Sequence, residues 1–314
     1  GQKIGMIIDL APDFNNFFSG VFGGSKLYGN DWNLNGEVDS RFENLWGAME
    51  RITFKWKNID STNQSFKISL YRPHLLITGV GLKGEYNYQI VNNYFTETQF
   101  GINVEFFNNY YGSFYIGYKQ GDITSTEQGL RKNYFSTNYK ALKFVFEHNS
   151  LNRVLLPDKG HKLDIEFDIG EDKLINELYV KTKLNFIGFS NFFHKINFCL
   201  KSYNDLIKPF QGEIGLSRQI SFGGVNSFRG FNDNQFKSSA ISVQSIEIHY
   251  NLDNAFKIIT FIDCGFAKDY YPKYSFGFGL SKISKTALID VQYAVPLGSA
   301  IQNGKVHLKW VTRL

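Results

Sequence analysis

The chain has 314 residues, of which 43% are hydrophobic, 17% aromatic and 20% charged, and its formal net charge is +5. No run approaches 18 apolar residues, which excludes a transmembrane helix, and the scattered Lys and Arg lack the dense basic cluster of a nucleic-acid-binding protein. Length alone permits several domains or one large barrel. A membrane barrel stays possible because a membrane strand needs only every second residue to be apolar.

Hydrophobic side chains recur with a period of two from end to end, which predicts strands and not helices. In the clearest example two sets interleave: Leu163, Ile165, Phe167 and Ile169 against Lys162, Asp164, Glu166 and Asp168. Such segments predict sixteen strands, a number typical of membrane barrels. They are expected near residues 3–11, 32–46, 48–59, 65–77, 80–92, 97–107, 112–121, 139–149, 160–171, 176–188, 191–203, 240–252, 255–268, 272–283, 286–296 and 305–314.

The connections between these segments differ in length. Long ones are expected at 12–31, 119–138 and 203–239, and tight ones at 45–48, 188–192 and 283–285. Outer-membrane barrels have long external loops and short periplasmic turns, so the alternation fits a barrel whose first strand runs outward.

The two faces of the strands differ in a way that favours lipid on one side. The polar face is densely charged, as a water-filled lumen requires, and the apolar face draws on 31 Phe and 18 Tyr, which suits aromatic girdles. A soluble all-β protein with one buried and one wet face is the alternative. We therefore predict an all-β chain in which residues 1–314 form one domain, a sixteen-stranded antiparallel transmembrane barrel.

A turn-rich stretch inside segment 203–239 reads Phe-Gly-Gly-Val-Asn-Ser-Phe-Arg-Gly-Phe from Phe222 to Phe231. On spacing alone, Arg229 is most simply an exposed turn residue. Alternation in the following strands puts Glu247 and Asp263 on the inward face if the aliphatic set faces lipid. In the next strand it leaves serines and glycines inward, which gives a loop room to lie against the wall.

Other constellations carry little chemistry. Asp31 to Gly36 copies the first half of a calcium loop, but Phe42 occupies the position of the required bidentate Glu, and the alternation there favours a strand. The six His have no metal-ligand spacing, Cys199 and Cys264 lie in separate strands, and catalytic motifs are absent. We expect no metal, no cofactor and no enzymatic activity.

The order of motifs in the last third of the chain resembles the barrel of the outer-membrane assembly and secretion superfamily that includes BamA, TamA and the two-partner secretion transporters. In that family a loop reads roughly V-R-G-F, a following strand carries Glu, and the next reads F-x-D-x-G. This chain has Ser227-Phe228-Arg229-Gly230-Phe231, then Glu247, then Phe261-x-Asp263-x-Gly265. The specific motifs extend from Gly223 to Gly279.

The resemblance implies that the long loop folds back into the lumen. Its residues Arg229, Gly230 and Phe231, with Asp263 and Glu247 on the wall, would then form a lumen-loop lock. Arg229 would pair with Asp263, with Glu247 as a second acidic neighbour. The docking wall for the loop would consist of Phe261, Gly265, Gly277 and Gly279.

A closed barrel also implies a seam between its first and last strands, here 3–11 with Gly5 and 305–314 with Trp310. In assembly factors the seam is a proposed lateral gate, to which a substrate strand adds. The equally compatible alternative is that Gly5 and Pro12 merely end an ordinary strand.

As a whole, the resemblance implies insertion or translocation of other proteins at the bacterial outer membrane. The partners would be the lipid bilayer, unfolded or partly folded outer-membrane or secreted proteins, and accessory subunits. No POTRA modules precede the barrel in this chain, which leaves substrate recruitment to another segment or partner. Two alternatives are the membrane anchor of a patatin-like lipase, which an upstream G-x-S-x-G domain would indicate, and a structural barrel of a larger envelope complex.

Overall fold

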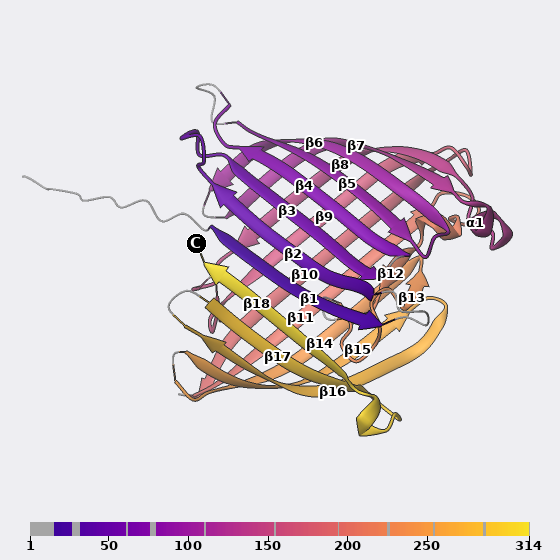
Figure 1. The fold of residues 1–314 in the computed structure, drawn as a ribbon. Helices are drawn as coiled ribbons and strands as arrows, with labels where there is room; N and C mark the ends of the chain where they lie inside the picture. Colours follow the sequence, from indigo (N-terminus) through magenta and orange to yellow (C-terminus); the bar gives the residue numbers. More distant parts are fainter. Residues whose placement is uncertain are drawn as a thin grey trace, which may run out of the picture.

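The computed structural model describes residues 16–26, 32–60, 62–75, 80–109, 111–153, 155–193, 195–224, 227–253, 255–284 and 287–313. Within them, sixteen antiparallel strands close into one barrel (Figure 1), as the alternation predicts. No helix among these residues is long and apolar enough to cross a membrane.

The barrel strands follow one another around the wall in chain order, and β18 closes on β1. The first eight are β1 Phe17–Lys26, β2 Trp32–Glu43, β3 Arg51–Asp60, β4 Asn63–Arg72, β5 Gly81–Val91, β6 Phe95–Asn109, β7 Gly112–Ser125 and β8 Thr137–Asn149. The other eight are β9 Gly160–Asp172, β10 Glu177–Phe193, β11 Ile196–Pro209, β14 Ala240–Asn251, β15 Phe256–Ala267, β16 Tyr270–Ile283, β17 Ala287–Pro296 and β18 Lys305–Arg313. Short elements lie between strands: α1 Glu127–Arg131, η1 Leu216–Arg218, β12 Ile220–Phe222, β13 Phe236–Ser238 and η2 Ile301–Asn303.

The first strand is not where the sequence predicted it. The predicted segment 3–11, with Gly5, lies outside the described residues, and β1 occupies Phe17–Lys26 inside the predicted long loop 12–31. That segment contains three glycines, Gly20, Gly23 and Gly24, which interrupt the hydrophobic alternation and therefore predict a turn. In the structure it pairs with β2 along its whole length. The other two long connections are shorter than predicted, 126–136 and 210–239, because β7, β8 and β11 extend into them.

We call the end of the barrel that carries segments 126–136 and 210–239 the loop end. The end at which β1 begins and β18 finishes is the terminal end.

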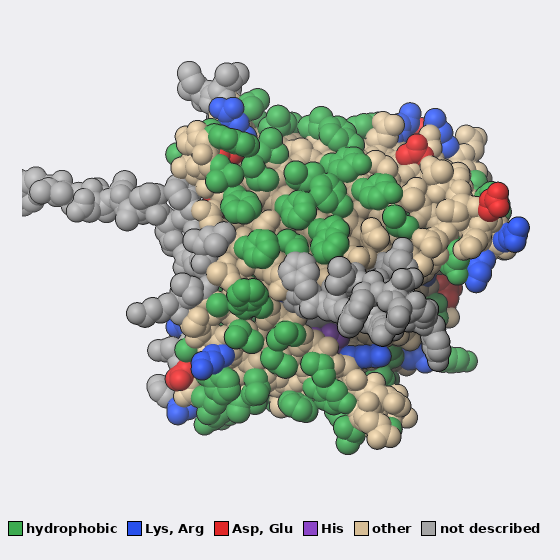
Figure 2. Space-filling model, viewed as in Figure 1, with side chains coloured by type: hydrophobic (Ala, Val, Ile, Leu, Met, Phe, Trp, Pro, Cys, Tyr) green, Lys and Arg blue, Asp and Glu red, His purple; other side chains and the backbone are tan. Residues whose placement is uncertain are grey.

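The predicted division of the faces is confirmed in the strands that follow the long loop. Ile246 and Ile262 are 59% and 61% exposed, whereas Glu247 and Asp263 are each 1% exposed. Figure 2 shows hydrophobic side chains covering much of the outer wall, with the charged side chains in view mainly toward its ends. Outward aliphatic side chains with inward acids are the arrangement of a membrane barrel with a polar interior.

The densely charged inward face predicted a water-filled lumen, but part of the interior is filled by apolar side chains. At the loop end, side chains of segment 210–239 pack on inward-facing apolar side chains of the wall. The loop supplies Ile214, Ile220, Phe222, Phe228 and Phe236, and the wall supplies Val91, Phe95, Ile123, Tyr139, Ala141, Tyr179, Ile207, Ile241 and Val243. Burying this apolar surface stabilises the loop against the barrel.

Candidate functional site: an arginine-bearing loop behind the strand seam

The loop 210–239 contains its own hairpin, which shapes the turn that carries Arg229. β12 pairs with β13, and beyond them a bridge joins Gly224 to Phe228. Gly223 and Gly224 have φ of +124° and +88°, a region that side chains strongly disfavour. A Cβ on Gly223 would also come within 2.4 Å of the Asn232 carbonyl oxygen. The two glycines therefore permit the tight turn that brings Phe228 and Arg229 to the barrel wall.

Arg229 is buried against the acidic inner wall and is 5% exposed. Its Nε lies 2.8 Å from Asp263 Oδ2 and its Nη2 lies 2.5 Å from Asp263 Oδ1, which is a two-pronged contact. Its Nη1 lies 2.7 Å from Glu247 Oε1. Burial alone would lower the pKa of Arg229, but the bonds to Asp263 and the charges of Asp263 and Glu247 raise it, so the guanidinium stays protonated.

Neutral groups complete the surroundings of the guanidinium. Nη2 donates to Ser245 Oγ at 2.6 Å and Nη1 donates to Gln292 Oε1 at 3.0 Å. The Arg229 Cζ atom also lies 3.5 Å from the ring centroid of Phe261, within cation–π range. Contacts from β14, β15 and β17 thus converge on one loop side chain.

Glycines of the docking wall make room for aromatic rings. A Cβ on Gly265 would lie 2.5 Å from Phe228 Cε1, and one on Gly277 would lie 2.4 Å from Phe261 Cζ. Phe228 is fully buried, and Phe261 is the ring beneath Arg229. The absent side chains therefore let the loop and its aromatic support approach the wall.

The other predicted positions of the loop and wall lie close by. Gly230 has φ of +86°, and a Cβ there would lie 3.1 Å from Ser275 Cβ. The Phe231 ring centroid lies 4.4 Å from that of Phe228. At Gly279 a Cβ would lie 2.7 Å from Gln292 Cγ. This glycine therefore leaves room for the side chain of Gln292, which accepts a hydrogen bond from Arg229. The structure thus groups the predicted residues of the lumen-loop lock and the docking wall, whereas Trp310 lies on β18 and Gly5 lies outside the described residues.

Substituting Gly265 by alanine should push the Phe228 ring out of its place and destabilise the docked loop by about 1–3 kcal/mol, the usual cost of overpacking. Gly84→Ala is the matched control, because a Cβ there meets nothing within 4 Å. Urea unfolding in detergent measures both variants. Equal stability of the two would contradict close docking at Gly265.

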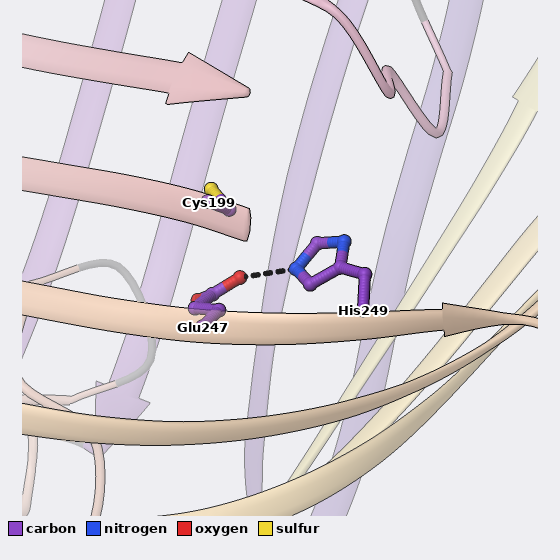
Figure 3. Close-up of side chains that lie close together, drawn as sticks. All are labelled: Cys199, Glu247 and His249. Carbon is purple, nitrogen blue, oxygen red and sulfur yellow. Dashed lines mark hydrogen bonds and ion pairs between the residues drawn. The ribbon is translucent and has the colours of Figure 1, made fainter. Parts of the chain in front are cut away.

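Glu247 also belongs to a buried cluster with Cys199 and His249 (Figure 3). Their potential ligand atoms lie within 4.8 Å of one another. Both oxygens of Glu247 are already engaged: Oε1 with Arg229 and Lys201, the latter at 2.6 Å, and Oε2 with His249 Nε2 at 2.7 Å. A divalent cation would have to displace these donors in a locally positive surrounding. The cluster is therefore better understood as the acidic partner of Arg229 than as a metal centre.

A second loop arginine, Arg218, was not singled out in the sequence. Its guanidinium carbon lies 3.4 Å from the Tyr139 ring centroid and 4.9 Å from that of Tyr179. Its Nε lies 3.0 Å from Asp172 Oδ2, and both side chains are buried. No sequence motif or spacing singles out Arg218, and Asp172 is the last residue of β9. Their contact could therefore be found only in the folded chain.

Replacing Arg218 by glutamine should free the start of the loop, because Asp172 loses a charge-assisted bond and two rings lose a cation. We expect faster cleavage by chymotrypsin at Phe210 or Leu216, at least tenfold, in the folded barrel. Arg131→Gln, at the last turn of the exposed helix α1, is the control. An unchanged cleavage rate for Arg218→Gln would show that this arginine does not hold the loop.

The loop also reaches the wall on the far side of the seam. Lys57 Nζ on β3 lies 2.8 Å from Asp233 Oδ1 of the loop, while Arg229 holds β14 and β15. Arg229 also donates to Gln292 of β17, so in the strand order β2, β1 and β18 lie between the nearest attachments. The loop therefore spans the inside of the seam.

The register between β1 and β18 is short. In the described residues of β1 and β18, the register joins Phe17 to Arg313, Phe18 to Thr312 and Ser19 to Val311, all at the terminal end. By contrast, β1 pairs with β2 from Phe17 to Lys26. Ser19 Oγ adds a 2.5 Å hydrogen bond to the Trp310 carbonyl. The two strands lie side by side in Figure 1, where the ends of the colour range meet.

Beyond Val311, the register of β18 with β1 does not continue toward the loop end in the described part of the two strands. The outward side chains Val306, Leu308 and Trp310 on this part of β18 are 69%, 52% and 45% exposed, as on the lipid-facing wall elsewhere. Trp310 lies on β18, where its carbonyl oxygen accepts the hydrogen bond from Ser19 of β1, whereas the predicted partner segment 3–11 lies outside the described residues.

A closed sixteen-stranded antiparallel barrel with an apolar outer wall and a charged interior defines a transmembrane β-barrel of the bacterial outer membrane. The Omp85 superfamily domain matches residues 28–311. The chain therefore belongs to the Omp85 superfamily, whose barrels serve assembly or translocation at the outer membrane. The resemblance inferred from the sequence motifs is confirmed.

Solved structures share the fold at low sequence identity. BamA from Haemophilus ducreyi lacking POTRA domains 1–3 matches with a TM-score of 0.68 and 16% identity, over 95% of this chain and 69% of that one. CdiB from Acinetobacter baumannii matches with a TM-score of 0.67 and 13% identity, over 97% of this chain and 61% of that one. CdiB from Escherichia coli matches with a TM-score of 0.64 and 14% identity, over 97% of this chain and 64% of that one. This chain thus spans less than two thirds of either CdiB. A search of curated proteins gave no significant match.

Proposed function

We propose that this barrel inserts or translocates other proteins at the outer membrane through the seam between β1 and β18, without a cofactor and without catalysing a covalent step. The observation that carries the proposal is the short register between these strands, which ends at Ser19 and Val311. Its partners would be the lipid bilayer and unfolded or partly folded outer-membrane or secreted proteins, with accessory subunits as further candidates.

The physical basis is the cost of unpaired backbone groups at membrane depth. In lipid, each unsatisfied N–H or C=O group costs several kcal/mol, so a client strand cannot enter alone. An open edge of β18 offers those groups to an incoming strand, as in other cases of strand addition. Because the barrel edge supplies the hydrogen bonds, the barrier to inserting the client strand falls.

The lumen-loop lock has a role in the same proposal. Arg229 holds the loop against β14 and β15, and the loop spans the inside of the seam. We propose that this fixes the strands on one side of the seam while the other side yields. Gly230 and Phe231 act as parts of the docked turn, and Phe261, Gly265, Gly277 and Gly279 as the surface that receives it.

The test is folding of a urea-denatured outer-membrane protein into liposomes with and without this barrel. We expect the barrel to raise the initial rate of client folding at least tenfold, read as protease-resistant client. Liposomes with an unrelated porin at the same protein-to-lipid ratio control for bilayer defects. A rate equal to the porin control would overturn the proposal and favour a structural role.

A further inference from the structure

We propose that the lumen holds a binding site for a multivalent phosphate-type oxyanion, in a cavity on the wall formed by β4 to β10. The cavity has a volume of about 160 Å³. Since a cavity needs only about 10–15 Å³ of such space to hold one water, this one takes several waters or one such anion. The site is separate from Arg229 and does not depend on the seam.

Charge is the first argument for an anion. Five lysines and two glutamates line the cavity, an excess of three positive charges: Lys67, Lys119, Lys143, Lys181 and Lys183 against Glu85 and Glu166. The other lining side chains, Asn87 and Gln99, offer amide donors. Ionic partners just outside the lining are Asp168, Asp205 and Lys83, and with them the excess is two.

Most of these lysines are neutralised by carboxylates. Lys119 pairs with Asp168, and Lys143 lies 3.2 Å from Glu166 and 3.4 Å from Glu85. Lys67 Nζ lies 3.8 Å from Glu85. These ion pairs line the cavity, and in them the carboxylates of Glu85, Glu166 and Asp168 are neutralised by the three lysines.

Two lysines on β10 supply the unmatched charge. Lys181 Nζ lies 3.9 Å from its carboxylate, Asp205 Oδ2. For Lys183 the described residues place no carboxylate oxygen within 4 Å, so Glu166 and Asp205 act on it only at longer range, and its Nζ lies 5.5 Å from the Tyr203 ring centroid. As residues two apart on a strand, the two ammonium groups face the same side. A cation held away from bulk water gains most from an anion brought beside it, and lysine binds phosphate as a point charge.

The experiment titrates the purified full chain in a neutral detergent with sodium pyrophosphate, in a phosphate-free buffer, by calorimetry and by thermal unfolding. We expect saturable binding and a rise in Tm with ligand concentration, because a ligand that binds the folded state stabilises it. Lys181→Gln combined with Lys183→Gln should weaken binding at least tenfold. These substitutions leave the ion pairs of Lys67, Lys119 and Lys143 in place and remove only the 3.9 Å contact of Lys181 with Asp205, so the barrel should still fold.

The matched control is Lys140→Gln combined with Lys208→Gln, which removes the same charge from exposed lysines toward the loop end. It should bind pyrophosphate as the wild type does. Equal weakening in both double variants, or an equal rise in Tm with sodium chloride at matched ionic strength, would overturn the proposal.

Dioctanoyl phosphatidic acid identifies the source of the phosphate. Competition between this lipid and pyrophosphate for the lysine-dependent site would indicate that a lipid headgroup can enter, and pyrophosphate binding without competition would indicate a free anion. Both outcomes support the site, whereas failure of both ligands to bind would disprove it.

Discussion

Replacing Arg229 by alanine is expected to lower the free energy of unfolding by about 3–5 kcal/mol, because removing one partner of a buried ion pair leaves the other charge uncompensated. Asp263 and Glu247 both lose their guanidinium partner, and both are buried. Urea unfolding in detergent micelles, followed by tryptophan fluorescence, measures the loss. Client folding in liposomes should fall in the same variant, since the loop is released from the wall.

Three further variants separate the proposed lock from a general effect. Arg153→Ala removes an arginine that is 43% exposed and 3.9 Å from Asp158, so its effect should be about 0–1 kcal/mol. Arg229→Lys keeps the charge but loses the planar fork, which predicts an intermediate loss. Asp263→Asn and Glu247→Gln, added to Arg229→Ala, should recover part of the stability because the stranded charges disappear. Equal stability of Arg229→Ala and Arg153→Ala would contradict the lock.

Closing the seam with a disulfide is expected to reduce client folding at least tenfold, in a reversible way. Ser19 and Val311 oppose each other in the register, and both are buried at the inner face. Opposed residues of antiparallel strands have Cα atoms about 4.5–5.5 Å apart, within reach of a disulfide. Ser19→Cys with Val311→Cys, in a background of Cys199→Ala and Cys264→Ala, should lose activity on oxidation and recover it with dithiothreitol.

The control for this cross-link uses the same cysteine on β1 with a partner on the other side. Ser19 also opposes Asp39 of β2, where the register continues along the whole of β1. Ser19→Cys with Asp39→Cys should therefore keep its activity when oxidised. Full activity of the oxidised Ser19–Val311 variant would rule out opening at this junction.

The strand number and the two faces could be predicted from sequence because they follow from a local rule, the alternation of side chains. That rule put Asp263 and Glu247 inward, where both are buried. It failed for β1, since Gly20, Gly23 and Gly24 carry no side chain to alternate. The ladder with β2 forms there through backbone groups, which a hydrophobic pattern does not report.

The residues of the candidate site could be predicted from the sequence only in part. Alternation alone left Arg229 as a turn residue, and its partners came from the order of family motifs. Arg218 and Tyr179 stayed hidden because their contact depends on how segment 210–239 enters the barrel. Inward apolar residues such as Tyr139 and Ile207 likewise gain their role only when the loop covers them.

The ion pair between Lys57 and Asp233 ties the loop to β3 while Arg229 ties it to β14 and β15. Any widening of the junction between β1 and β18 must therefore stretch a tether whose two anchors differ in strength. The Lys57 anchor is partly exposed, so dissolved ions screen it, whereas the Arg229 anchor is shielded. Raising the ionic strength should break the Lys57–Asp233 ion pair first. The strands on the β3 side of the seam should then move, while those held by Arg229 stay fixed.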